Sequence, residues 1–193
     1  MIYSIPRYPV HLIDVVVWGD GRRLTIRPTL PQDLDLQRAF FRSLSPATRY
    51  ARFMTGLTEL PEMVARRFAN IDYSEHLALL AEIFEAGSER MLGEARYVVE
   101  PHDPSTCVFA IAVADDWHGS GLAGMLLARL EQQAAICGIE RMTAETLSGN
   151  RPMLALAARA GYALGLSHND GAVVRLEKRL TAPAANRGHV AAA

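Results

Sequence analysis

The residues of this chain best suited to chemistry lie in a glycine-rich stretch past its midpoint, at positions 113–124 (Val-Ala-Asp-Asp-Trp-His-Gly-Ser-Gly-Leu-Ala-Gly). This stretch joins an apolar, strand-like segment (106–113) to a helical pattern that begins at Gly121. Glycine lets a backbone approach a ligand closely, and the first N–H groups of a helix have no partner inside the helix. Because a helix N-terminus also carries a partial positive charge, this junction predicts an anion site that suits phosphate.

Other loops share features with this stretch. Residues 119–124 read Gly-x-Gly-x-x-Gly, the dinucleotide fingerprint, but five residues separate them from the strand and a single βα unit follows. Ser120 between two glycines is similar to a nucleophile elbow, which needs glycine where His118 and Leu122 stand. The Gly-Lys-Ser/Thr of a phosphate-binding P-loop does not occur. A glycine turn that serves packing alone is the remaining interpretation.

The elements that must position this loop follow from hydrophobic periodicity and turn residues. Thr29 and Gln32 have the spacing of a capping box, and Ser45 followed by Pro46 is typical of a helix start. We expect helices at 29–41, from 45, at 61–69, at 121–137 and at 152–160. We expect strands at 12–18, 23–27, 76–84, 91–99, 106–113, 141–146, 163–166 and 173–180.

This order predicts one α/β (α+β) domain with a mixed, mostly antiparallel sheet flanked by helices. The two short connections between 76 and 113 indicate an antiparallel meander, and the helix after it brings 141–146 parallel to 106–113. We expect an N-terminal arm over residues 1–11, a folded domain over 12–180 and a disordered tail over 181–193.

Composition argues against several classes of protein. Half of the 193 residues are hydrophobic, enough for a core without covalent staples. The net charge of −1, without runs of like charge, argues against nucleic-acid binding. No apolar run approaches the ~20 residues of a membrane span, and no charged-then-apolar leader occurs, so we expect a cytoplasmic protein. Cys107 and Cys137 lack CxxC spacing, and we expect neither a disulfide framework nor a metal site.

Several segments resemble one family of enzymes, the GNAT N-acetyltransferases. Residues 118–123 (His-Gly-Ser-Gly-Leu-Ala) resemble its Gln/Arg-x-x-Gly-x-Gly/Ala signature for acetyl-coenzyme A. Leu24-Thr25-Ile26-Arg27-Pro28 resembles its first strand, and residues 150–162 resemble its Asn-x(10)-Gly-Phe/Tyr helix. Residues 44–50 (Leu-Ser-Pro-Ala-Thr-Arg-Tyr) are similar to the GNAT module of bacterial protein lysine acetyltransferases.

The resemblance implies a GNAT-like fold and direct transfer of acetyl from acetyl-coenzyme A to an amine, on a protein lysine or a small molecule. It also implies which residues bind the coenzyme. The backbone N–H groups of six consecutive residues would hold the pyrophosphate: His118, Gly119, Ser120, Gly121, Leu122 and Ala123. The strand at Ile111, Ala112 and Val113 would pair with the pantetheine arm, and Asn150 would hydrogen-bond to that arm.

Two positions depart from the family's catalytic pattern. Protein-acetylating relatives commonly carry a glutamate where this chain has Val108, and many members carry a tyrosine where it has Ala157. His118 and Ser120 also replace the common Gln and Arg. A missing base matters because a lysine amine of pKa ~10.4 is neutral in only about one part in 10³ to 10⁴ at pH 7.

Other carboxylates can replace the missing base, and we expect Glu145 or Glu94 to do so. Holding the amine against the thioester lowers the barrier by about 7–11 kcal/mol, more than a base typically contributes. Transfer without glutamate at 108 is therefore expected. The alternative hypothesis is a coenzyme-binding module that has lost turnover and acts as a sensor or regulator.

Overall fold

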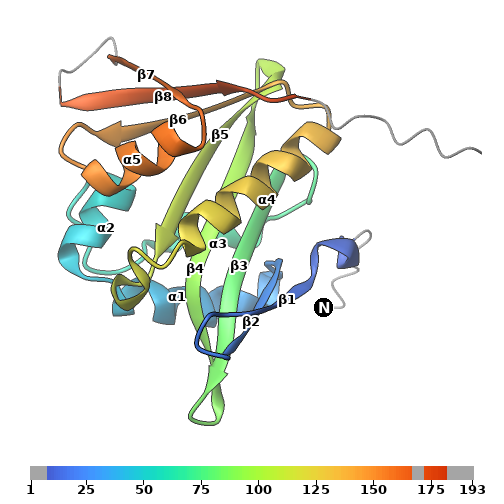
Figure 1. Cartoon of the computed structure of the whole chain (residues 1–193), viewed down its shortest axis with the longest axis vertical. Coiled ribbons are helices and arrows are strands. Elements are labelled where there is room, and N and C mark those ends of the chain that lie inside the picture. Colours follow the sequence, from blue (N-terminus) through green and yellow to red (C-terminus); the bar gives the residue numbers. More distant parts are fainter. Residues whose placement is uncertain (1–7, 167–171, 182–193) are drawn as a thin grey trace, which may run out of the picture.

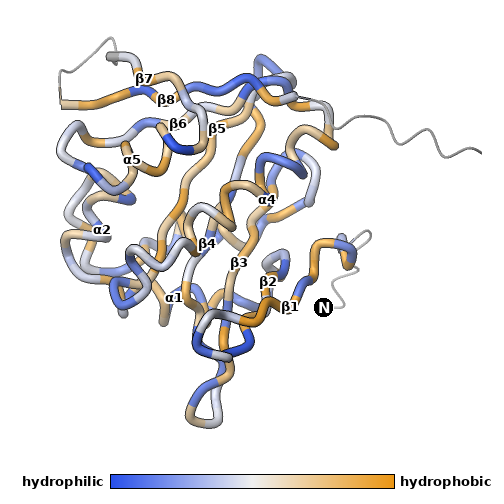
Figure 2. The backbone as a smooth tube through the Cα atoms, in the orientation of Figure 1, coloured by the Kyte–Doolittle hydropathy of each residue, from blue (hydrophilic) through white to orange (hydrophobic). Residues whose placement is uncertain are grey.

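The centre of the fold is the antiparallel meander expected from the sequence, and it is seen in the computed structural model, which describes residues 8–166 and 172–181. The meander consists of β3 (His76–Glu85), β4 (Ser88–Glu100) and β5 (Asp103–Val113). Ala86 and Gly87 connect β3 to β4 with positive φ angles of 50° and 83°, which match the twist of a hairpin. Figure 2 shows hydrophobic residues along β3, where Leu77, Leu79 and Leu80 are buried.

In the part of the chain that the structure describes, eight strands form one sheet in the order β1-β2-β3-β4-β5-β6-β8-β7. The strands outside the meander are β1 (Asp14–Val17), β2 (Arg23–Pro28), β6 (Arg141–Leu147), β7 (Ala163–Leu166) and β8 (Val173–Arg179). Only β5 and β6 pair in parallel among these neighbours. The predicted mixed, mostly antiparallel sheet is confirmed. Residues 1–7 of the expected arm and 182–193 of the expected tail lie outside the described residues.

Helices cover both faces of the sheet (Figure 1). One face carries α4 (Leu122–Ile136) and α5 (Arg151–Arg159); the other carries α1 (Leu34–Ser43), α2 (Pro46–Phe53) and α3 (Glu62–Ala69). Two neighbouring residues of β4 show that α4 and α1 lie on opposite faces of the sheet, because successive side chains of a strand point to opposite faces. A Cβ on Gly93 would lie 3.3 Å from Leu126 of α4, whereas Glu94 accepts a hydrogen bond from Gln37 of α1. None of the helices in residues 8–166 and 172–181 is both long enough and apolar enough to span a bilayer.

The helix starts confirm one sequence prediction and correct another. Ser45 caps α2, since its Oγ accepts the Thr48 N–H at 3.2 Å. The predicted capping box of Thr29 and Gln32 is wrong, because the pair that caps this helix start lies one residue later, at Leu30 and Asp33. A 3₁₀ turn (Pro31–Asp33) precedes α1, and the Asp33 carboxylate accepts the Leu30 N–H at 2.7 Å. Thr29 is fully buried and contacts β3 instead, so its hydroxyl is not available at the helix end.

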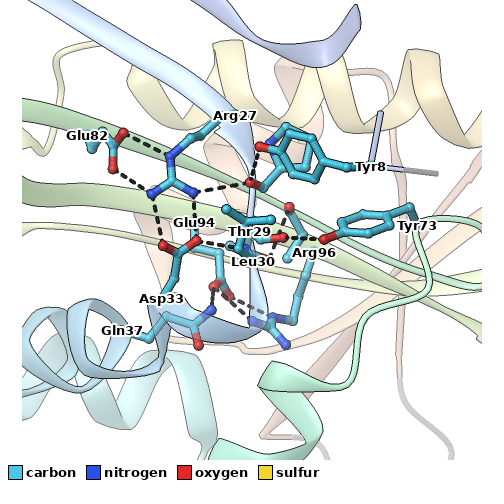
Figure 3. Close-up of polar contacts among 12 residues, drawn as sticks. Tyr8, Arg27, Thr29, Leu30, Asp33, Gln37, Tyr73, Glu82, Glu94 and Arg96 are labelled. Carbon is cyan, nitrogen blue, oxygen red and sulfur yellow. Dashed lines mark hydrogen bonds and ion pairs between the residues drawn. The ribbon is translucent and has the colours of Figure 1, made fainter. Parts of the chain in front are cut away.

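A buried ion-pair cluster joins β2, β3 and the start of α1 (Figure 3). The guanidinium of Arg27 donates to both oxygens of Glu82 (2.9 and 3.0 Å) and to both oxygens of Asp33 (2.6 and 3.0 Å). The three side chains are only 9–14% exposed. Arg27 thus fixes α1 against the sheet, and α1 forms one wall of the pocket described below.

Substitution Arg27→Met should lower the free energy of unfolding by about 3–5 kcal/mol, because it leaves two buried carboxylates without their cation. Urea denaturation followed by circular dichroism measures this loss. Arg22→Met is the matched control, since Arg22 makes an exposed ion pair with Asp20 and its loss should change stability little. Equal losses in the two variants would contradict the structural role of the Arg27 cluster.

Candidate functional site

The glycine-rich loop lies between the end of β5 and the first turn of α4, as the sequence predicts. A 3₁₀ turn (Asp115–Trp117) leads into Gly119 (φ 75°) and Gly121 (φ 95°). Side chains with a Cβ rarely adopt such positive φ angles, so these two positions require glycine. A Cβ built on either glycine meets no atom within 4 Å, so the space at these two positions is open.

Three of the six N–H groups expected to hold a pyrophosphate are used inside the loop. The His118 N–H donates to the Asp115 carbonyl (3.2 Å), and the Ser120 N–H donates to the Trp117 carbonyl (3.3 Å). The Leu122 N–H donates to the Ser120 Oγ at 3.2 Å. These bonds hold the loop in shape.

The remaining three N–H groups, and in addition that of the following Gly124, have no acceptor among the described residues. The four groups are those of Gly119, Gly121, Ala123 and Gly124. The last two belong to the first turn of α4, where no partner within the helix exists. A helix N-terminus with four N–H groups that lack an acceptor in the described residues is the kind of site that binds a phosphate group.

The loop is fixed to the elements on either side of it. His118 Nε2 lies 3.0 Å from the Val113 carbonyl oxygen, so this nitrogen carries the proton and donates. Asp115 accepts hydrogen bonds from the Ser45 N–H, the Ser45 Oγ and the Thr48 Oγ1 at 2.7–2.8 Å. Burial raises the pKa of Asp115, but these hydrogen bonds outweigh burial and hold it below its usual range. Sequence reasoning missed the contact of Asp115 with α2, although it identified Ser45 as the helix cap.

β5 lacks a partner strand on one side where the loop begins. β5 and β6 pair only from Thr106 to Val108, and Figure 1 shows the two strands diverging beyond that point. The Ala114 N–H donates to β4, and hydrogen bonding alternates along an antiparallel ladder. The backbone groups of Ile111 and Val113 therefore face the gap between β5 and β6, although the Val113 carbonyl is taken by His118.

Asn150 and Ala157 both lie in or beside α5. The amide of Asn150 is used at both ends: its Oδ1 accepts the Met153 N–H (3.2 Å), and its Nδ2 donates to Thr146 (3.0 Å). Asn150 is thus the N-cap of α5. Ala157 is fully buried, whereas Val108 on β5 is 41% exposed.

A pocket lies on the opposite face of the sheet, between β4 and the helices α1, α2 and α3. Its walls are mostly apolar, and Glu94 of β4 and Ala112 of β5 both line it. These two residues are directly opposite each other in the β4–β5 ladder. The full lining is Gln37, Phe40, Phe41, Leu44, Arg52, Phe53, Leu60, Phe68, Met91, Glu94 and Ala112. The pocket therefore adjoins the segment of β5 expected to lie along the coenzyme arm.

The two carboxylates expected to act as bases lie in different environments. Glu94 is buried and accepts hydrogen bonds from Arg96 (2.6 and 2.8 Å) and Gln37 (2.9 Å), as Figure 3 shows. Burial raises the pKa of Glu94, but the charge and hydrogen bonds of Arg96 outweigh burial, so the pKa is lowered. Glu145 is exposed on β6, opposite Arg175 of β8, and does not line the pocket.

Comparison with known proteins gives consistent matches. The model of the acetyltransferase (GNAT) family matches residues 39–162. The chain is 33% identical over 143 residues to Acetyltransferase PA5475 of Pseudomonas aeruginosa, covering 74% of this chain and 76% of that protein. It is 27% identical over 141 residues to Acetyltransferase Pat of Mycolicibacterium smegmatis, covering 73% of this chain but only 41% of that protein.

A solved structure shows the same fold. The GNAT domain of S. lividans PAT superposes with a TM-score of 0.81 and 28% sequence identity, covering 90% of this chain and 100% of that domain. The expected GNAT-like fold is therefore confirmed. Together with the family match, this similarity shows that the chain belongs to the GNAT family and is an acyltransferase with acetyl-coenzyme A as its co-substrate.

Proposed function

We propose that this protein transfers acetyl from acetyl-coenzyme A directly to an amine presented from the pocket on the α1–α3 face of the sheet. The coenzyme's diphosphate binds the free N–H groups of Gly119, Gly121, Ala123 and Gly124. Its pantetheine arm runs along β5 at Ile111. Bound acetyl-coenzyme A supplies an activated thioester and a thiolate leaving group.

The adjacency of the open edge of β5 and the pocket carries this proposal. The backbone of Ile111 faces the gap where β5 lacks a partner, and the next residue, Ala112, lines the pocket. A thioester held along β5 and an amine held in the pocket would thus meet across a single strand. Positioning of this kind contributes about 7–11 kcal/mol to catalysis.

We assign Glu94 the role of orienting the amine. It lines the pocket, it is ionised, and it lies directly opposite Ala112. Its lowered pKa makes it a weak base, so it suits accepting a hydrogen bond from the amine while the proton leaves through water. Glu145 lies on β6, beyond the gap, and is the alternative carboxylate for the proton.

An assay of coenzyme A thiol release over a panel of amines tests the proposed transfer. Release should depend on both the amine and the enzyme, and mass spectrometry should detect the N-acetylated amine. Heat-inactivated enzyme controls for spontaneous aminolysis. Tight binding of acetyl-coenzyme A without release above this background, for every amine tried, would favour the coenzyme-binding module without turnover.

Substitution Gly121→Ala should weaken coenzyme A binding at least about tenfold in calorimetry, because the new Cβ occupies the space in front of the loop and disturbs charge-assisted hydrogen bonds. Gly138→Ala is the matched control at the other end of α4. Gly138 also has positive φ (84°) and open space around it, so both variants should lose about 1–2 kcal/mol of stability. Equal affinity in the two variants would place the diphosphate elsewhere.

Substitution Glu94→Gln should lower the free energy of unfolding by about 3–5 kcal/mol at neutral pH, because Arg96 is left without a buried counter-charge. The folded-state pKa of Glu94 is lowered, so its contribution is present above the unfolded pKa of ~4.3 and is lost as pH falls through the folded value. Urea titrations from pH 7 to 3 should show the two proteins converging. Glu89→Gln, exposed on the same strand, is the control, and a pH-independent difference would refute the role of ionised Glu94.

A further inference from the structure

His118 is the one residue of the glycine-rich loop whose side chain can carry a positive charge. Residues 113–124 contain two aspartates, Asp115 and Asp116, but neither lysine nor arginine. The side chains of this loop can therefore offer a diphosphate no positive charge other than that of His118. Histidine is the side chain whose charge ordinarily changes between pH 5 and 8, so the charge that the loop offers depends on pH.

The hydrogen bond of the His118 ring determines where the ring can gain a proton. Nε2 lies 3.0 Å from the Val113 carbonyl oxygen and donates to it, so Nδ1 is the nitrogen without a proton in the neutral ring. In the part of the chain that the structure describes, Nδ1 makes no hydrogen bond. The residue is exposed, so a proton can reach Nδ1 from solvent. Protonation therefore adds a charge while the bond that fixes the loop to β5 remains.

The charged groups around His118 keep their charges in this pH range. Burial raises the pKa of Asp115, but hydrogen bonds from α2 outweigh burial and keep this carboxylate ionised beside His118. Asp116 is paired with Arg90 of β4 through two hydrogen bonds of 2.7 Å. Arg22 stacks on the same 3₁₀ turn and is paired with two carboxylates, those of Asp20 and Glu85. Among these described groups, His118 is the one that can respond to a bound anion by changing its charge.

A bound diphosphate would bring negative charge next to this ring. His118 directly precedes Gly119, whose N–H has no acceptor among the described residues, and consecutive Cα atoms are about 3.8 Å apart. An opposite charge within ~4–6 Å favours the charged form of a titratable group. A bound anion should therefore raise the proton affinity of Nδ1. By thermodynamic linkage, a proton on Nδ1 strengthens anion binding by the same factor.

Resting on the proposed function, we propose that His118 takes up a proton when coenzyme A binds, so that the affinity for the coenzyme rises as the pH falls from 8 to 6. The diphosphate is common to acetyl-coenzyme A and to coenzyme A, so substrate and product are affected alike. The proton on His118 thus acts on coenzyme binding and not on the transfer of the acetyl group.

Calorimetry with dephospho-coenzyme A measures this proton uptake directly. The analogue keeps the diphosphate, which stays ionised from pH 6 to 8, and lacks the 3′-phosphate, whose own titration would contribute protons. Titrations at pH 7 in three buffers of different ionisation enthalpy give the number of protons taken up per site. A tenfold rise in the proton affinity of Nδ1 corresponds to about 0.5 proton, and to an affinity about fivefold higher at pH 6 than at pH 8.

Three variants separate the charge of His118 from its hydrogen bond. His118→Gln keeps an N–H that can donate to the Val113 carbonyl but cannot gain a charge. Its uptake should fall to about zero, and its affinities at pH 6 and pH 8 should agree within about twofold. His118→Arg is charged throughout, so it should take up no proton and should bind more tightly than His118→Gln at pH 8. His102→Gln is the matched control, because His102 is exposed in the turn between β4 and β5, and it should keep the wild-type uptake.

The outcomes distinguish this inference from the proposed function. If neither coenzyme A nor its dephospho analogue binds to the wild-type protein, the proposed coenzyme site fails and the inference fails with it. If both bind without proton uptake, or with equal uptake in wild type and His118→Gln, the inference is overturned and the coenzyme site remains. Uptake that is lost in both His118 variants and kept in His102→Gln supports the inference. Circular dichroism of each variant confirms that a lost uptake is not a lost fold.

Discussion

The fold of this protein depends on how little of β5 pairs with β6. The two strands share a ladder of three residue pairs and then diverge, although the backbone groups of β5 continue for five more residues. Unpaired backbone groups inside a protein are costly unless a ligand or water satisfies them. The divergence therefore creates an edge in the middle of the sheet, and that edge is where an extended ligand can add hydrogen bonds.

The parallel pairing also explains why an anion site adjoins this edge. A parallel partner requires a crossover, and here the crossover is α4, whose first turn must lie just beyond the end of β5. His118 ties the loop back to the Val113 carbonyl, and Asp115 ties it to the start of α2. Because α2 also carries Arg52 into the pocket, the loop and the pocket belong to one connected unit.

Local signals predicted most of the elements and missed one helix cap. Ser45 and Pro46 marked the start of α2 correctly, because a cap acts over three residues and needs no tertiary partner. Thr29 failed as a cap because Asp33 is drawn to Arg27, which in turn binds Glu82 on β3. The ion pairs that Arg27 makes with Asp33 and Glu82 involve residues distant in the sequence, so a local pattern cannot predict them.

By itself, the sequence determined the order of the elements, the position of the glycine-rich loop and the family to which the chain belongs, because periodicity, turns and short motifs are properties of neighbouring residues. Only the tertiary structure decided which charges share the pocket. Leu92 is an extra residue in β4 opposite the register shift between Ala81 and Glu82, and such a bulge helps to set which face each later side chain occupies. It brings Glu94 to the face of α1 and α2, beside Arg52, while Glu145 stays on the far side of the gap.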